Sequence, residues 1–197
     1  MVERQLRRRG IDDARVLDAM GAVPRERFVP SAQSRRAYRD GALAIGDGQT
    51  ISQPWIVAQM ITLLELDGHE RVLEVGTGSG YAAAVLSRCC AEVISIERHG
   101  ALAQRAQETL AGLGYANVEV RHGDGTGGAG DRAPFGGILV AASAEHEPPA
   151  ALRGQLERNG ALVCPVRNAD GEHLMRYREG HSETVTPVRF VPLVEGA

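Results

Sequence analysis

The stretch "RVLEVGTGSGY", residues 71–81, decides the fold of this 197-residue chain. A short run of β-branched and apolar residues leads into glycines at positions 76, 78 and 80, and an apolar run with helical spacing follows. This order predicts a strand, a tight turn and a helix. Glycine has no Cβ, so the backbone of such a turn can approach a ligand closely. The N–H groups at the start of the helix can donate hydrogen bonds to that ligand.

Strands and helices alternate on the C-terminal side of this turn, which predicts βαβ units and a parallel sheet. The last two extended runs have no helix between them and predict an antiparallel pair. We therefore expect an α/β fold, Rossmann-like, with a doubly wound, mostly parallel sheet and an antiparallel C-terminal strand pair. The expected strands are residues 71–76, 92–97, 117–125, 135–143, 161–167, 173–180 and 183–194, and the expected helices are residues 81–90, 100–114 and 148–160.

The residues before the glycine-rich turn predict N-terminal helices. Residues 2–20 carry apolar side chains at helical spacing, with a break at Gly10, and "VPRERFVP" at residues 23–30 is bounded by prolines and predicts a connector. Residues 54–66 predict another helix, with Pro54 in its first turn, where proline is tolerated.

The length and composition fit one soluble globular domain, since 43% of the residues are hydrophobic and 24% are charged. We expect a single domain over residues 1–197. Residues 1–66 would form an N-terminal helical lid, and residues 67–197 an α/β core.

The charge distribution argues against nucleic acid and anionic membranes as partners. The net charge is −3, so no overall positive field exists. Residues 1–40 hold ten arginines against six acidic residues, which is read most simply as a solvated amphipathic helix. The chain has no lysine, which excludes a Schiff-base or P-loop lysine.

The cysteines and histidines predict a cytoplasmic protein without a metal site. The three cysteines Cys89, Cys90 and Cys164 are an odd number and include an adjacent pair, which is typical of reduced thiols. The six histidines show no metal-ligand spacing. No apolar run approaches the roughly 20 residues that span a membrane.

Two acidic residues indicate what the glycine-rich turn binds. The spacing is G-x-G-x-G, and Tyr81 stands where the dinucleotide fingerprint needs a glycine. Glu97 ends the second expected strand, where a carboxylate accepts hydrogen bonds from both ribose hydroxyls of a nucleoside. Asp124 follows the third strand and is placed to accept from an adenine amino group. A nucleoside held by carboxylates, without a pyrophosphate cradle, predicts S-adenosylmethionine.

The chain lacks the motifs with which two classes of methyltransferase act on nucleic-acid bases. The fourth strand is followed by "VAASAE", without the [DN]-PP-[YF] motif of enzymes that methylate amino groups in nucleic acids. Cys164 and Pro165 stand in the reverse order to the Pro-Cys nucleophile of C5-cytosine enzymes. These absences favour an acceptor that is already nucleophilic, such as a carboxylate, for which catalysis is mainly proximity and orientation.

Five motifs resemble the protein-L-isoaspartate (D-aspartate) O-methyltransferase family, and the resemblance spans nearly the whole chain. It implies methyl transfer from S-adenosylmethionine to the α-carboxylate of L-isoaspartyl residues in damaged proteins and peptides. The ester would close to a succinimide, which initiates repair, and S-adenosylhomocysteine would be the second product. The motifs are "GQTISQP" at residues 48–54, "VLEVGTGSGY" at 72–81, "SIER" at 95–98, "GDG" at 123–125 and "VRFVPL" at 188–193.

The resemblance also implies the site residues. Ser52 would be the catalytic serine, and from the residues alone its hydroxyl either orients the substrate carboxylate or caps the following helix. The implied cofactor-binding residues are Gln49, Thr50, Ile51, Ser52, Glu74, Gly76, Thr77, Gly78, Ser79, Gly80, Glu97, Arg98, Asp124 and Gly125.

Other functions stay open at this point. Ala44, Gly136 and Ala141 depart from the usual family residues. The departures around Gly136 and Ala141 permit one alternative, a tailoring methyltransferase that acts on aspartate of a ribosomally made peptide. A non-catalytic cofactor-binding or RNA-binding module is another. We expect isoaspartyl proteins and peptides as partners, no nucleic acid or membrane partner, and a monomer.

Overall fold

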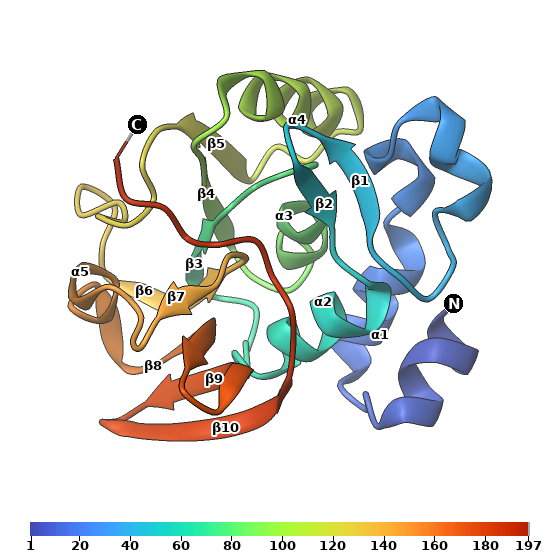
Figure 1. Cartoon of the computed structure of the whole chain (residues 1–197). Helices are drawn as coiled ribbons and strands as arrows, with labels where there is room; N and C mark the ends of the chain where they lie inside the picture. The colour runs from blue at the N-terminus through green and yellow to red at the C-terminus, as the bar shows by residue number, and fades with distance from the viewer. Residues whose placement is uncertain (197) are drawn as a thin grey trace.

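The predicted parallel strands form one sheet in the computed structural model, which describes residues 1–196 (Figure 1). The strand order is β10-β9-β8-β6-β3-β4-β5, and β7 pairs with β8. Strands β3 to β8 pair in parallel, whereas β9 and β10 run antiparallel to their neighbours, as expected. The bounds are β3 (Arg71–Val75), β4 (Glu92–Glu97), β5 (Val118–His122), β6 (Phe135–Val140), β7 (Ala144–Glu145), β8 (Leu156–Asn168), β9 (Gly171–Arg178) and β10 (His181–Pro187).

The two faces of the sheet are covered unequally. On one face, Val72 and Leu139 belong to a large buried cluster that includes side chains from all of the first four helices. On the other face, Leu73 and Ile138 pack with Leu152 and with the helix-free connection between β5 and β6. Alternate residues of β3 thus face opposite sides, as strand geometry requires. The helices are α1 (Ala14–Ala22), α2 (Pro54–Thr62), α3 (Tyr81–Leu86), α4 (Gly100–Gly112) and α5 (Ala150–Arg153).

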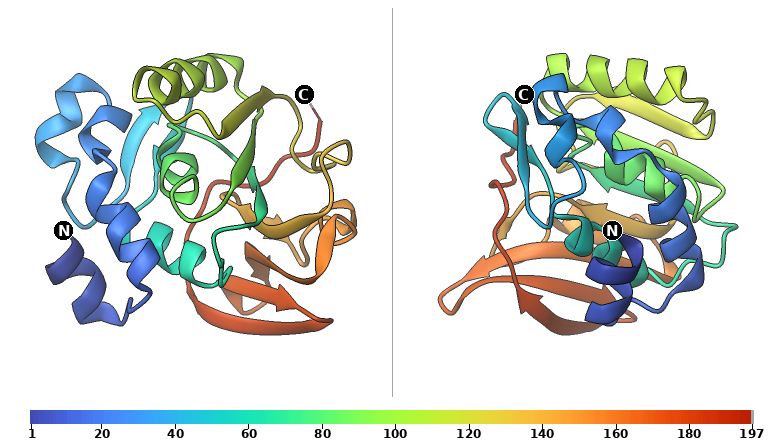
Figure 2. Two further views of the ribbon diagram at one scale, coloured as in Figure 1. Left: turned by 180° about the vertical axis from the view of Figure 1, so that it is seen from behind. Right: turned by 90° about the vertical axis from the view of Figure 1, so that its right-hand side faces the viewer.

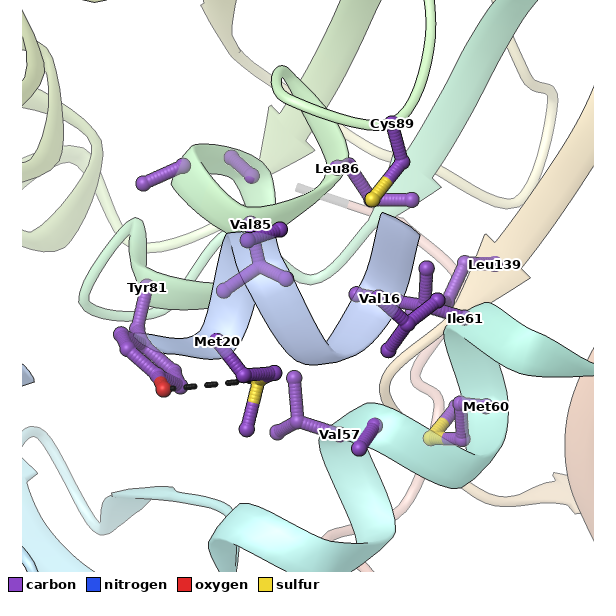
Figure 3. Close-up of a cluster of buried hydrophobic side chains, with 14 of the residues drawn as sticks. Val16, Met20, Val57, Met60, Ile61, Tyr81, Val85, Leu86, Cys89 and Leu139 are labelled. Atoms are coloured by element: carbon purple, nitrogen blue, oxygen red, sulfur yellow. Dashed lines mark hydrogen bonds between the residues drawn. The ribbon is translucent and has the colours of Figure 1, made fainter. Parts of the chain in front are cut away.

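The N-terminal region packs against α2 and α3 at one side of the sheet (Figure 2). Figure 3 shows side chains of α1, α2 and α3 in the shared cluster, with Val16 and Met20 of α1 facing Val57 and Ile61 of α2. The hydroxyl group of Tyr81, the first residue of α3, lies 3.5 Å from the sulfur of Met20. The first helix is therefore part of the hydrophobic core.

The N-terminal helices are shorter than expected. The predicted break at Gly10 is present, with φ of 90°, but the residues before it form only a π-helical turn (Val2–Leu6) and a 3-10 turn (Arg7–Arg9). The following α-helix begins at Ala14, because the Asp13 carboxylate accepts a hydrogen bond from the Val16 N–H and caps it. The predicted connector contains a 3-10 helix (Arg25–Phe28), and another follows (Ser31–Arg36).

A small hairpin was not predicted. Strand β1 (Leu43–Gly46) pairs antiparallel with β2 (Gln49–Ile51). The middle of "GQTIS" is therefore a strand, and its serine lies between this strand and α2. The hairpin lies beside the large sheet and over its α3 side (Figure 1).

The predicted helix over residues 148–160 is wrong in its second half. The helix ends after Arg153, and β8 begins at Leu156, which pairs with Phe135. Two prolines before the helix and Gly154 after it restrict it to one turn, so the helix-favouring residues that follow join the strand. No helix among residues 1–196 is long and apolar enough to cross a membrane.

Gly160→Ala should destabilise the fold by about 1–3 kcal/mol, because overpacking forces the backbone to shift. A Cβ at this position would lie 3.0 Å from the carbonyl oxygens of both Phe135 and Gly136. As a matched control, Gly112→Ala at the exposed end of α4 meets nothing within 4 Å and should raise stability by up to about 1 kcal/mol. Urea denaturation of the three proteins measures both effects, and equal stabilities would contradict the packing argument.

Candidate active site

A cavity of about 310 Å³ lies at the carboxyl ends of β3, β4 and β6. In a doubly wound sheet, ligands bind in the crevice where the connections from two adjacent strands leave in opposite directions. Here these strands are β3, which continues to β4 on one side, and β6, which continues to β7 and β8 on the other. Eleven of the residues predicted from the sequence line the cavity: Gln49, Thr50, Ile51, Ser52, Gly76, Thr77, Gly78, Ser79, Glu97, Arg98 and Gly125.

The glycine-rich turn is held open by backbone hydrogen bonds. The Gly76 N–H donates to the Ile96 carbonyl oxygen at 2.8 Å, which ties the turn to β4. Gly78, with φ of 54°, lines the cavity. Gly80 does not line it, because it packs against α4, where a Cβ would lie 3.2–3.3 Å from Leu110 and Ala106. Gly80 therefore serves helix packing, while Gly76 and Gly78 form the cavity wall.

Glu97 presents a carboxylate to the cavity in a fixed orientation. Only 4% of the residue is exposed. Its Oε2 accepts a hydrogen bond from the Gly78 N–H at 2.8 Å, and its Oε1 accepts from the His99 N–H at 2.9 Å. Each carboxylate oxygen has a further lone pair, so both can accept from vicinal hydroxyl groups. This arrangement suits the ribose of a nucleoside.

Glu74 lies beneath the glycine-rich turn and outside the cavity lining. It is fully buried, and its Oε2 accepts from the hydroxyl of Ser95, which lies 2.5 Å from the hydroxyl of Thr77. Its Oε1 has no hydrogen-bond partner among residues 1–196. Burial raises the pKa of Glu74 to about 8, the Ser95 hydrogen bond opposes the rise, and the Glu97 charge adds to it. A protonated carboxyl at this position shares a polar network with the turn.

Asp124 is placed differently from the expectation that it faces the ligand. Its Oδ1 accepts from the N–H and hydroxyl of Thr126 at 2.8 and 2.7 Å, and its Oδ2 accepts from the Gly196 N–H at 2.7 Å. These hydrogen bonds lower the pKa of Asp124, with the Thr126 N–H the largest contribution. Asp124 itself is absent from the cavity lining, whereas the next residue, Gly125, contributes to it.

Ser52 lies where two cavities meet. It lines the cavity described above and also a neighbouring groove of about 560 Å³. This groove runs between Arg9 and Trp55 on one side and residues 186–191 on the other. The Ser52 hydroxyl does not cap α2, because Gln53 is the N-cap residue and no side chain caps the helix. The hydroxyl is therefore available to a ligand.

The C-terminal segment forms a wall of the cavity that was not predicted from the sequence. Residues 191–194 line the cavity, and the segment is held by Ser143, whose N–H donates to the Val191 oxygen and whose carbonyl accepts from the Leu193 N–H, both at 2.8 Å. In Figure 1 this segment (red) runs from β10 across the sheet towards β5. "VRFVPL" was noted as a motif, but its extended, proline-containing pattern gave no sign of a site. Tyr81, His99, Ala141 and Ala142 are further lining residues that were not predicted.

Within residues 1–196, no group of three or more His, Cys, Asp or Glu side chains could hold a metal ion.

A family comparison matches the chain over residues 1–197 with the model described as Protein-L-isoaspartate(D-aspartate) O-methyltransferase (PCMT). Similar proteins named protein-L-isoaspartate O-methyltransferase include one from Roseiflexus sp. (strain RS-1), 53% identical over 192 residues, which are 95% of this chain and 88% of that protein. Another, from Methylorubrum extorquens (strain PA1), is 54% identical over 201 residues, covering 100% of this chain and 87% of that protein.

Solved structures agree. One protein-L-isoaspartate O-methyltransferase matches with a TM-score of 0.85 and 28% identity over 98% of this chain and 65% of that longer chain. A second, described as a beta-aspartate methyltransferase (PCMT) from Plasmodium falciparum in complex with S-adenosyl-L-homocysteine, has a TM-score of 0.81 and 26% identity over 96% and 95% of the two chains. The predicted resemblance and the class I methyltransferase fold are both confirmed.

Glu74→Gln should remove part of the pH dependence of stability. The pKa of Glu74 is raised from 4.5 to about 8, so between these values the folded protein keeps a proton that the unfolded chain releases. The free energy of unfolding should therefore fall as the pH rises from about 5 to 8, and the glutamine variant should lack this component.

Urea denaturation at several pH values measures the slope. Glu183→Gln, at an exposed position of β10, is the control and should keep the wild-type slope. A Glu74→Gln protein with the full wild-type slope would contradict the assignment.

Proposed function

Because the chain belongs to the protein-L-isoaspartate(D-aspartate) O-methyltransferase family, we propose that it methylates the α-carboxylate of L-isoaspartyl residues in damaged proteins and peptides. S-adenosylmethionine is the methyl donor and S-adenosylhomocysteine the product. The ester closes spontaneously to a succinimide, so the reaction initiates repair. The observation that carries the proposal is the position of Ser52, on the wall shared by the cavity and the open groove.

The residues of the cavity fit the nucleoside part of S-adenosylmethionine. Glu97 would accept from the ribose hydroxyls, and Gly78 allows the turn to approach the ligand closely. Val75, Ile96 and Leu193 supply apolar surface for the adenine and the thioether chain. Asp124 would act through Gly125 and the C-terminal segment that it holds, since Asp124 itself does not line the cavity.

The acceptor needs little chemical activation. S-adenosylmethionine supplies a methyl group on a sulfonium centre, and a carboxylate is already ionised at neutral pH. The chain therefore has to bring the carboxylate into line and exclude water. The Ser52 hydroxyl is a hydrogen-bond donor that can orient one carboxylate oxygen. Ala141 and Val191 also line both cavities and give the reaction space apolar walls.

We also propose the domain organisation and cellular setting. Residues 1–66 supply the hairpin and one side of the groove, and residues 67–197 supply the cofactor core, in one domain. The free, buried cysteines Cys89, Cys90 and Cys164 support a cytoplasmic location. We propose a monomer without a nucleic-acid partner. No observation favours the peptide-tailoring alternative or the non-catalytic module.

The decisive test is methyl transfer from labelled S-adenosylmethionine to three matched peptides that differ only in carrying L-isoaspartate, L-aspartate or D-aspartate at one position. We expect strong labelling of the isoaspartyl peptide and little labelling of the aspartyl peptide. Ser52→Ala should lower turnover of the isoaspartyl peptide about tenfold or more while S-adenosylhomocysteine binds as in the wild type, because one donor to the carboxylate is lost.

Ser182→Ala is the control for Ser52→Ala. Ser182 is exposed on strand β10, away from both cavities, so its substitution should leave turnover at the wild-type value. Labelling of the aspartyl peptide alone would overturn the repair function. Wild-type turnover by Ser52→Ala would remove the serine from the mechanism.

Glu97→Ala should weaken S-adenosylhomocysteine binding by about 1.5–3 kcal/mol, because charge-assisted hydrogen bonds to the ribose are lost. Isothermal titration calorimetry gives the dissociation constants. Glu108→Ala, at an exposed position of α4, serves as the control and should bind normally. An unchanged affinity of Glu97→Ala would refute the ribose assignment.

A further inference from the structure

Arg25 is a fully buried arginine without an acidic partner. None of its surface is exposed. Its Nε donates to the Ala37 carbonyl oxygen at 2.8 Å, and its Nη2 donates to the Ser52 carbonyl oxygen at 2.7 Å. The guanidinium carbon lies 4.6 Å from the centre of the Tyr81 ring. Within the described part of the chain, Nη1 has no hydrogen-bond partner and no carboxylate forms a salt bridge with Arg25.

A buried charge of this kind is normally paired, since removing it from water is costly. Burial lowers the pKa of Arg25, and only the tyrosine side chains Tyr81 and Tyr38 oppose this. Two carbonyl oxygens and an aromatic ring stabilise the guanidinium, but none carries a negative charge at neutral pH. The chain therefore supplies a positive charge without its counter-charge.

The position of this charge relates it to the substrate. Ser52 and Tyr81, two of the three residues that Arg25 contacts, both line the cavity. Helix α2 begins two residues after Ser52 and has no side-chain cap, so the N–H groups of Trp55 and Ile56 lack intrahelical acceptors. The N-terminus of a helix adds positive potential of its own. A buried cation thus binds the serine carbonyl oxygen, and a helix N-terminus begins two residues after the serine.

We propose that Arg25 is a positioning residue that makes this site select an anionic carboxylate. Resting on the proposed function, the inference gives Arg25 two effects. Its hydrogen bond to the Ser52 carbonyl oxygen holds the backbone that carries the serine hydroxyl, and its charge is compensated by the substrate carboxylate. Methylation converts that carboxylate into a neutral ester, so the attraction disappears once the product has formed. The same charge therefore favours binding of the substrate and release of the product.

A purely structural role for Arg25 makes a different prediction. The side chain also joins the N-terminal segment, through Ala37, to the hairpin end. If it only held these segments together, its loss would weaken the binding of charged and neutral ligands to the same degree. A role in charge selection changes the ratio between the two affinities.

The test uses two peptides, one with L-isoaspartate and one with the α-carboxylate replaced by a carboxamide. Dissociation constants are measured with the protein saturated with S-adenosylhomocysteine. The wild type should prefer the carboxylate. Arg25→Met should weaken binding of the carboxylate peptide about tenfold or more, as loss of a desolvated charge partner does, and change carboxamide binding by less than about twofold. Arg25→Lys should retain part of the preference.

Arg36→Met is the matched control, since Arg36 is exposed in the same N-terminal segment and lines neither cavity. It should keep the wild-type ratio of affinities. Equal loss for both peptides in Arg25→Met, or no change in either, would overturn the proposal.

If Arg25→Met does not fold, a measurement on the wild-type protein still tests the proposal. A buried charge is screened far less by salt than an exposed one, so the preference for the carboxylate should persist at about 1 M NaCl. Loss of the preference at high salt would assign it to exposed arginines such as Arg9 in the groove and overturn the role of Arg25. If the wild type binds no isoaspartyl peptide, the proposed function fails. If it binds the peptide with a ratio independent of Arg25, only this inference fails.

Discussion

The central constraint on this protein is that β3 is buried on both faces while its carboxyl end stays open to a ligand. Val72 and Leu73 point into opposite hydrophobic clusters, and neighbouring strands occupy both edges. Only the end of the strand can therefore present polar groups to a ligand, and the glycine-rich turn begins there. The burial of β3 also explains the hydrogen bonds beneath the glycine-rich turn. Glu74 lies within the buried strand, so its carboxyl must be protonated and hydrogen-bonded to Ser95.

The N-terminal region shares the hydrophobic core that covers one face of β3. Val16 and Met20 pack against α2 and α3 (Figure 3), so this region shares the core of the sheet. Arg25 then links it to the hairpin end and to the first residue of α3. A segment with this much burial opens only at a cost close to that of unfolding the core around it. It contributes packed residues to the wall of the site, and the hairpin tip near Asp47 and Gly48 is more exposed.

The sequence was sufficient for the sheet and most of the cavity, and the reason is local. Strands β3 to β6 are short runs that contain Val or Ile, Gly or a carboxylate stands at the ends of β3, β4 and β5, and "GQTIS" and "GTGSGY" mark the site by composition. The misses have a common origin in long-range contacts. Strand β2 has three residues and exists because it pairs with β1. Leu156 and its neighbours favour a helix by propensity, but pairing with Phe135 places them in a strand. Asp124 holds Gly196, which no local pattern could indicate.

The cavity walls come from residues 48–52 and from residues 191–194, so segments that are far apart in the sequence must meet before a binding space exists. Contacts of such large sequence separation form late and slowly in folding. During synthesis, a nascent chain could assemble the N-terminal helices and the first βαβ units, yet it would lack one side of the cavity until residues 191–194 had left the ribosome. Ligand-binding competence therefore requires residues 191–194 to be in place, and the donor nucleoside can stabilise only molecules that contain them.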